Sequence, residues 1–182
     1  MNALHIELDK EHSAFQWLET QADKIGARGH IGTHLDCYTC IPQKSEYQIK
    51  IHCMDCSSSM PDLADCQSMP NLKQAALLLY TGNMEQNGYG NKAYFEKDTT
   101  LSEEALKEIL RHEPLFIMID SHGIGSQGKV HIGLDKLCES NGCHVIENIN
   151  MTSAIKNDIH NIKILIVIEN PSTGKPCKLY YE

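Results

Sequence analysis

The chain has 182 residues, of which 41% are hydrophobic and 22% are charged. This composition is sufficient for one sizeable core, which excludes a disordered chain and a small protein held together by disulfides. The formal net charge is −8, and Lys and Arg do not cluster anywhere along the chain. The acidic balance disfavours a nucleic acid or an anionic membrane as partner, because phosphate binding starts from a basic surface.

No apolar stretch approaches the roughly 20 residues that a membrane-spanning helix needs. The first residues carry Glu7, Asp9 and Glu11 where a signal peptide has a basic region and an apolar core. We therefore expect a cytoplasmic protein. In that compartment its eight cysteines are expected to be thiols or metal ligands rather than disulfides.

Three elements of the first half follow from apolar periodicity. Over residues 10–26 apolar side chains recur at helical spacing, and Gly26 stands where a helix usually ends, which predicts a helix. Over residues 45–53 apolar and polar side chains alternate, which predicts a strand with one buried face. Ala75–Tyr80 is a short apolar run that predicts a fully buried strand.

The second half alternates between helix and strand. The expected elements are, in chain order, a Gly- and Asn-rich loop at 82–92, a helix at 101–111 with Thr100 and Glu103 at capping-box spacing, a strand at 115–120, a helix at 134–141, strands at 143–148 and 162–168, and an edge strand at 177–181. The chain contains no linker, low-complexity tract or internal repeat. This pattern indicates a single α/β domain.

The sharpest local feature is the segment GHIGTHLD, residues 29–36. Read as extended chain, its period of two puts His30, His34 and Asp36 on one face, and Gly32 leaves room for an ion between them. Two imidazoles and a carboxylate suit zinc, manganese or iron(II). The alternative is a strand edge with incidental histidines, in a chain that has ten.

Four cysteines offer a rival metal site. Cys37 and Cys40, followed by Cys53 and Cys56, form two C-x-x-C pairs at the spacing of a structural zinc site. Against this reading, the residues between the pairs have the pattern of an ordinary sheet strand, and a core of this size needs no metal to fold.

Residues 123–129, GIGSQGK, contain two overlapping phosphate-binding patterns. They match the G-x-G-x-x-G of a dinucleotide fold and a P-loop that lacks its Ser or Thr. Both patterns require a helix that begins within the glycines. Because residues 130–133, VHIG, are poor helix starters, we interpret the segment as a flexible loop.

Glu147 lies in the apolar sequence CHVIENIN. A carboxylate in a buried strand needs a cation or hydrogen-bond donors, because its unpaired burial is costly. A metal ion held by the GHIGTHLD segment would supply that cation. Alternatively, Glu147 lies at the end of the strand and its carboxylate reaches solvent, in which case it needs no partner.

Taken together, these segments resemble the cyclase family, which includes bacterial kynurenine formamidase and isatin hydrolase. GHIGTHLD resembles the family's HxGTHxD metal motif. LLLYTG, FIMIDSHGIGS, NGCHVIENI and NPSTGKPCKLYY follow in the family's order and resemble its buried strand ending in Thr-Gly, its Gly-Ile-Asp segment, its strand with a metal-binding glutamate and its closing hairpin. The resemblance covers residues 28–182, which leaves residues 1–27 as an N-terminal helical extension of a single domain.

The resemblance implies a swivelling β/β/α fold, with a mixed sheet and flanking helices, assembled as a homodimer or homotetramer. It further implies that His30, His34, Asp36 and Glu147 bind one or two divalent ions, zinc or manganese. The implied reaction is hydrolysis of an amide-like C–N bond of a small molecule by a metal-activated water. The family's best-known type of substrate is a formamide such as N-formylkynurenine, from tryptophan catabolism.

Two positions depart from the family pattern. Where the family continues HxGTHxDxPxH, this chain has Tyr38 for the proline and Cys40 for the last histidine, which is the family's general acid and base. Where the family has a further histidine ligand, this chain has Asp135, which can bind the same metals. Cys40, His122 and His131 are therefore candidates to assist catalysis, and either histidine could replace the missing ligand. The alternative function is a metal- or small-ligand-binding protein of the same fold that has lost catalysis.

Overall fold

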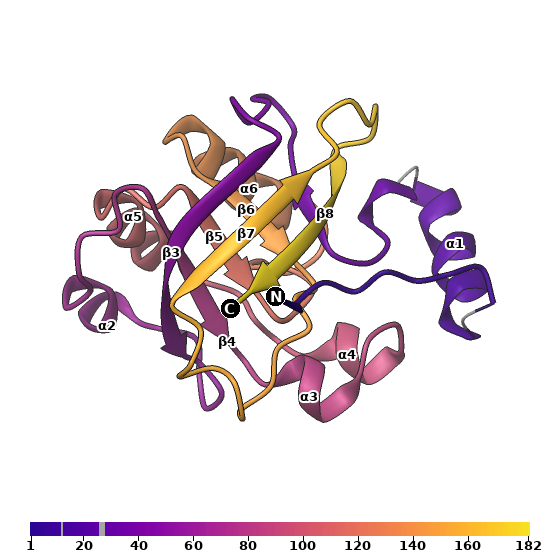
Figure 1. Ribbon diagram of the computed structural model, residues 1–182, viewed down its shortest axis with the longest axis horizontal. Helices are drawn as coiled ribbons and strands as arrows, with labels where there is room; N and C mark the ends of the chain where they lie inside the picture. The colour runs from indigo at the N-terminus through magenta and orange to yellow at the C-terminus, as the bar shows by residue number, and fades with distance from the viewer. Residues whose placement is uncertain (12, 26–27) are drawn as a thin grey trace.

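A closed, mixed β-sheet forms the centre of the molecule, and helices flank part of it, while β7 and β8 face the viewer with no helix in front of them (Figure 1). The computed structural model describes residues 1–11, 13–25 and 28–182. Around the sheet the strands follow in the order β8, β2, β6, β5, β4, β3 and β7, and β7 pairs back with β8. Neighbours from β3 to β6 run parallel and the other neighbours antiparallel. The strands are β2 (His34–Asp36), β3 (Glu46–Asp55), β4 (Ala75–Tyr80), β5 (Phe116–Ile119), β6 (His144–Glu147), β7 (Asn161–Ile166) and β8 (Gly174–Tyr181).

Helices cover the outer face of the parallel strands. Side chains of α2, α5 and α6 pack there against β4, β5 and β6 in one apolar core, while a second apolar core fills the inside of the barrel. The helices are α1 (Ser13–Ile25), the 3-10 helix η1 (Arg28–His30), α2 (Leu63–Gln67), α3 (Asn83–Asn87), α4 (Lys92–Glu96), α5 (Glu103–Arg111) and α6 (Lys129–Ser140). Among the described residues, no helix combines the length and apolar character needed to cross a bilayer.

Strand β4 shows why its sequence is apolar throughout. Leu77 and Leu79 belong to the core under the helices, whereas Leu78 and Tyr80 belong to the core inside the barrel. A strand buried on both faces needs apolar side chains at every position. The prediction of a fully buried strand at Ala75–Tyr80 is confirmed.

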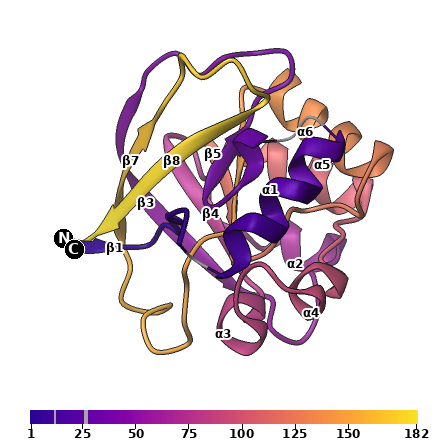
Figure 2. The same cartoon turned by 90° about the vertical axis from the view of Figure 1, so that its right-hand side faces the viewer.

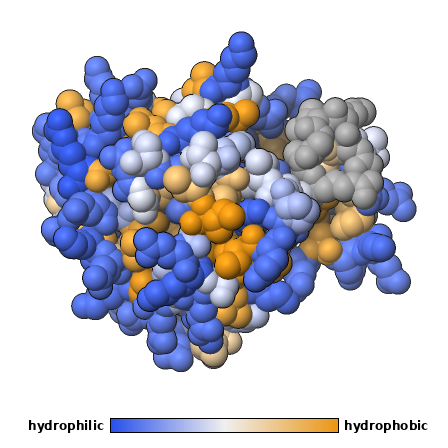
Figure 3. Space-filling view, turned by 90° about the horizontal axis from the view of Figure 1, so that it is seen from above, coloured by the Kyte–Doolittle hydropathy of each residue, from blue (hydrophilic) through white to orange (hydrophobic). Residues whose placement is uncertain are grey.

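Strand β3 confirms the alternation predicted over residues 45–53. Tyr47 and Ile49 pack against the core inside the barrel, and Gln48 and Lys50, which alternate with them, are exposed. The strands predicted in the second half are also present, each within three residues of its expected start. On the face shown in Figure 3, hydrophilic side chains predominate, and hydrophobic ones gather in smaller areas between them.

The N-terminal residues join the sheet before they form a helix. Strand β1 (Asn2–Ala3) pairs with the end of β8, which places the two termini side by side (Figure 2). The chain then leads to α1, which lies to one side of the barrel (Figure 1). Helix α1 falls within the predicted range 10–26, and Gly26 lies outside the described residues.

Three local predictions are wrong. Helices α3 and α4 lie in and beyond the segment 82–92 that was expected to be a loop. The side chain of Ser102, and not that of Thr100, caps α5 by accepting a hydrogen bond from the Ala105 amide. Helix α6 begins at Lys129, five residues before the predicted start, and this earlier start shapes the functional site.

Candidate metal centre

Three polar side chains share the outer face of the sheet at strands β2 and β6. His34 lies opposite Glu147 in the antiparallel pairing of these strands. Directly opposed residues project from the same face, and Asp36, two residues further along, projects there too. Leu35 between them faces the inside of the barrel. All three polar side chains are buried, with exposures of 1 to 3%.

Helix α6 brings two more groups onto this face. His131 and Asp135 are four residues apart and lie on one side of the helix, with His131 Nε2 3.2 Å from Asp135 Oδ2. His131 Nε2 also lies 3.5 Å from Asp36 Oδ2 and 3.4 Å from Glu147 Oε1. The sequence analysis named both residues as candidates, but because it expected the helix to start only at residue 134, it did not place them together on one side of a helix.

His30 reaches the cluster from outside the strand, so the extended reading of residues 29–36 is wrong. His30 ends η1, and Gly32 turns the chain with a φ of +75°. A side chain at Gly32 would collide with the Ile6 carbonyl oxygen, 2.6 Å from an added Cβ, so the glycine serves the turn and this close approach. The turn places His30 Nδ1 3.1 Å from both His34 Nε2 and Asp36 Oδ1.

Hydrogen bonds behind the cluster orient the two imidazoles. His34 Nδ1 donates to the Gly32 carbonyl at 2.9 Å, which leaves Nε2 with its lone pair toward the cluster. The Asn148 amide donates to the same carbonyl, also at 2.9 Å. His30 Nε2 lies 2.9 Å from Thr173 Oγ1, so its Nδ1 faces the cluster. Partners of this kind fix the tautomer and the orientation of histidine ligands in metal sites.

The six side chains form two groups that could each hold a metal ion. The first comprises His30, His34 and Asp36, and the second comprises Asp36, His131, Asp135 and Glu147. The distances from His30 Nδ1 and His34 Nε2 within the first group are 3.1 to 3.7 Å, and those from His131 Nε2 within the second are 3.2 to 3.5 Å. Donors bound to a tetrahedral ion at about 2.1 Å lie about 3.4 Å apart, which matches this spacing.

Unsatisfied polar atoms make the cluster suitable for a cation. Both oxygens of Asp36, both oxygens of Asp135, Glu147 Oε1 and His131 Nδ1 are buried without a hydrogen-bond partner. Buried polar atoms are normally paired, and unpaired carboxylates carry a high desolvation cost. A divalent ion would satisfy the carboxylate oxygens, so the residues present fit such an ion.

The charges of the cluster are strongly coupled. Burial raises the pKa of Asp135 to about 9, and burial together with the nearby Asp36 raises the pKa of Glu147 well above its usual range. Burial alone would lower the pKa of His131, but the surrounding carboxylates raise it to about 10. Burial opposes ionisation of Asp36, yet the neighbouring histidines hold its pKa below the usual range. Without an ion, the cluster therefore retains protons that an ion would displace.

No protein-family model matches the chain, and no curated protein matches it. Solved structures do match. A potential metal-dependent hydrolase with cyclase activity superimposes with a TM-score of 0.69 at 14% identity, over 98% of this chain and 94% of that one. An isatin hydrolase bound to the product analogue thioisatinate gives a TM-score of 0.63 at 13% identity, over 85% of this chain and 73% of that one. A novel cyclase gives 0.62 at 11% identity, over 98% and 86%.

The chain has the cyclase-like fold. This confirms the predicted mixed sheet with flanking helices. The two matches that cover 98% of the chain extend into residues 1–27, a part for which the sequence resemblance did not account.

Two glycines of residues 123–129, Gly123 and Gly125, lie against the cluster. A Cβ on Gly123 would lie 2.5 Å from Glu147 Oε1 and 2.5 Å from His131 Cε1. A Cβ on Gly125 would lie 2.9 Å from the His131 Cα. The loop thus passes so close to the cluster that side chains do not fit. The argument that no helix follows these glycines is wrong, since α6 begins directly after Gly128.

Glu139, which the sequence analysis did not single out, fastens the loop that follows β2. Its buried carboxylate accepts hydrogen bonds from the Tyr38, Thr39 and Cys40 amides, at 2.6 Å for Thr39 and 3.1 Å for Cys40, and from the Thr39 hydroxyl. Glu139 follows His131 and Asp135 at helical spacing on α6. This i, i+4, i+8 series is the signal that could have revealed it.

The remaining candidates for proton transfer are Cys40 and His122. Cys40 is exposed at the end of the loop that Glu139 fastens. His122 is half-buried next to Gly123, with Nδ1 3.2 Å from Ser121 Oγ, and its ring packs on Tyr94. Burial, aided by the charge of His131, lowers the pKa of His122, so this imidazole is neutral at pH 7.

The four-cysteine zinc site is contradicted. Cys37 belongs to the core inside the barrel, and Cys56 belongs to the core under the helices, so the sheet separates them. In the described parts of the chain, both groups that could hold a metal lack cysteine. All eight cysteines are free, as expected.

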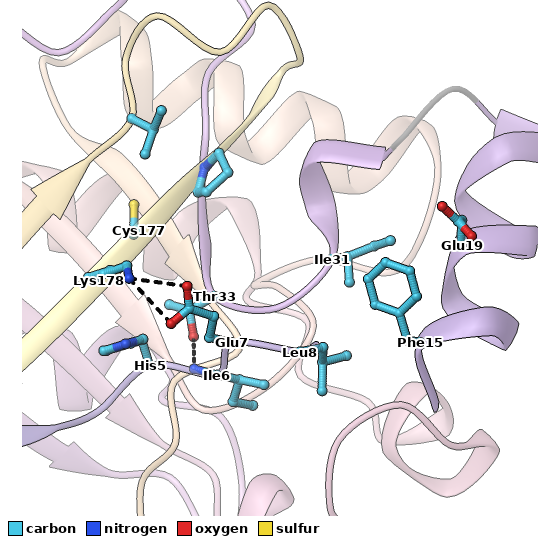
Figure 4. A pocket seen from close by; sticks show the side chains of 12 residues that line it. His5, Ile6, Glu7, Leu8, Phe15, Glu19, Ile31, Thr33, Cys177 and Lys178 are labelled. Carbon is cyan, nitrogen blue, oxygen red and sulfur yellow. Dashed lines mark hydrogen bonds and ion pairs between the residues drawn. The ribbon is translucent and has the colours of Figure 1, made fainter. Parts of the chain in front are cut away.

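A separate groove of about 320 Å³ lies between β8, the N-terminal residues and α1 (Figure 4). Apolar side chains such as Phe15, Leu8 and Ile31 line it, and an ion pair between Lys178 and Glu7 spans one wall. None of the six cluster residues lines this groove, so we do not assign it to the metal chemistry.

Proposed function

We propose that the chain is a metal-dependent hydrolase that cleaves an amide-like C–N bond of a small molecule, as an arylformamidase does. One observation carries this proposal. Six buried histidine and carboxylate side chains converge at the spacing of metal ligands, and their unpaired oxygens face one another. An isatin hydrolase among the structural neighbours supports an amide substrate, because isatin is a cyclic amide.

The described residues suggest which side chains would bind metal and which would orient the ligands. His30, His34 and Asp36 would hold one divalent ion, zinc or manganese, and the group from α6 and β6 a second. A bound ion polarises a carbonyl oxygen and lowers the pKa of a water molecule. Gly32, Thr173 and Asn148 keep the imidazole rings aimed at the ion from behind.

His122 would carry the proton that the leaving amine needs. Its imidazole is neutral at pH 7 and can therefore accept a proton from the attacking water before passing it on. It adjoins Gly123, which lies against both Glu147 and His131. Cys40 occupies the family's histidine position in sequence, but its side chain is exposed and has no described contact with the cluster, so we assign it a secondary role.

The test compares three proteins loaded with Zn²⁺ or Mn²⁺: the unaltered chain, His34→Ala and the control His160→Ala, whose histidine is exposed. Aromatic formamides and isatin-like lactams are the substrates, and metal content is measured by elemental mass spectrometry. Loss of one ligand should lower metal affinity and turnover by at least about a hundredfold, the upper end of what loss of a supporting partner costs. His160→Ala should match the unaltered chain.

Two outcomes would contradict the proposal. If His34→Ala keeps both metal and turnover, the cluster is not the active site. If the unaltered chain holds metal but hydrolyses no amide, the chain is a metal- or small-ligand-binding protein that has lost catalysis.

A further inference from the structure

The two groups of the cluster, called its first and second half below, share Asp36 and offer an ion different donor atoms. The first half presents two imidazole nitrogens, from His30 and His34, and one oxygen of Asp36. The second presents one imidazole nitrogen and three carboxylates, from the residues His131, Asp36, Asp135 and Glu147. Asp36 contributes Oδ1 to the first half and Oδ2 to the second.

This difference has a chemical consequence. Imidazole suits zinc, and carboxylate oxygens suit harder ions such as manganese and magnesium. In the first half one carboxylate, that of the shared Asp36, would face a divalent ion, whereas in the second half three carboxylates would face it. We propose that the halves select different ions, Zn²⁺ in the nitrogen-rich half and Mn²⁺ in the oxygen-rich half. The inference rests on the proposed metal-dependent function.

Asp135 is the residue that would set the selectivity of the oxygen-rich half. It is 1% exposed, and neither of its oxygens has a hydrogen-bond partner. Its position on α6, one turn after His131, directs a carboxylate into the second half alone, since Asp135 belongs only to that group. A histidine there would give both halves two imidazoles and remove most of the difference between them.

The experiment measures metal exchange and so does not depend on turnover. Metal-free protein receives two equivalents of Zn²⁺, and Mn²⁺ is then raised stepwise. Bound metals are counted by elemental mass spectrometry, and bound Mn²⁺ is followed by electron paramagnetic resonance. Since zinc generally binds more tightly than manganese, the informative quantity is the Mn²⁺ excess at which each zinc is displaced.

In the unaltered chain, we expect one zinc to exchange at a Mn²⁺ excess at least about tenfold lower than the other, a difference of about 1.4 kcal/mol. Asp135→His should raise the excess needed for the first exchange by about tenfold or more. Asp135→Asn keeps the shape of the side chain and removes its charge, so it should also raise the Mn²⁺ excess needed for the first exchange. This second variant keeps the test decisive if the histidine variant fails to fold. Asp158→His, at an exposed aspartate, is the matched control and should change nothing.

The inference is overturned if both zinc ions exchange together, if only one ion binds, or if both Asp135 variants exchange like the unaltered chain. These outcomes are separable from a failure of the proposed function. Amide turnover with simultaneous exchange would refute only the inference. Stepwise exchange without turnover would refute only the hydrolase.

Discussion

Glu139→Gln tests how much the hydrogen bonds between Glu139 on α6 and the loop after β2 contribute to the free energy of unfolding. The carboxylate is 3% exposed and accepts four hydrogen bonds from the loop. A glutamine has the same shape, but its amide group replaces one acceptor oxygen with a donor. Oε1 accepts one of the four hydrogen bonds and Oε2 accepts the other three, so an amide group in the place of Oε1 loses one hydrogen bond to a charged acceptor, worth about 1.5–3 kcal/mol, and leaves the other three with a neutral acceptor. We expect the free energy of unfolding to fall by at least about 1.5–3 kcal/mol.

The assay is urea denaturation, in which the midpoint should fall while the slope stays constant. Hydrogen exchange should increase at the amides of residues 38–40. Glu104→Gln provides the control, because Glu104 is an exposed glutamate on helix α5, and surface substitutions of this kind stay within about 0.5 kcal/mol. A loss below about 1 kcal/mol in Glu139→Gln, with unchanged amide exchange, would refute the assigned role of Glu139.

Three further predictions concern the cluster and the thiols. Gly123→Ala should lower metal content, because its Cβ would lie 2.5 Å from atoms of Glu147 and His131. The control Gly133→Ala, with open space around the added Cβ, should retain metal and gain up to about 1 kcal/mol of helix stability. Equal metal content in the two variants would contradict this prediction. In the folded chain the pKa values of Asp135, about 9, and His131, about 10, lie above their unfolded values. The metal-free chain should therefore lose stability as the pH rises from about 5 to about 9, while its metal affinity should rise. Thermal denaturation with and without chelator measures both trends, and a metal-free chain that is more stable at about pH 9 than at about pH 5 would refute the predicted direction. Cys40 is the exposed cysteine, so a thiol reagent should label one site rapidly in the native chain and none in Cys40→Ser; rapid labelling of several sites would contradict the buried thiols.

Much of the fold could be predicted because periodicity is local. The alternation over residues 45–53 and the apolar run Ala75–Tyr80 each record which faces of a strand are buried, and both predictions are confirmed. His34 and Asp36 could be assigned to one face in the same way. Glu147 stood out because a charge in an apolar strand needs a partner.

The misplaced start of α6 shows where local reasoning fails. Residues 130–133 are weak helix formers, yet Leu134 and Cys138 pack into the core under the helices, and that packing outweighs local propensity. Once the helix begins at Lys129, His131 and Asp135 come to lie on one side of it, and Glu139 follows one turn later.

The sequence by itself therefore determined most of the strands, the α/β class and two candidate ligands on one strand face. The sequence and the family resemblance also named the other four cluster residues as candidates, but only the tertiary structure decided how they come together with His34 and Asp36. His30 arrives through a turn at Gly32, His131 through the earlier helix start, and Glu147 through strand pairing with β2. The physical reason is that periodicity depends on neighbours along the chain, whereas these contacts join residues up to 113 positions apart, as between His34 and Glu147. Long-range packing alone brings them together.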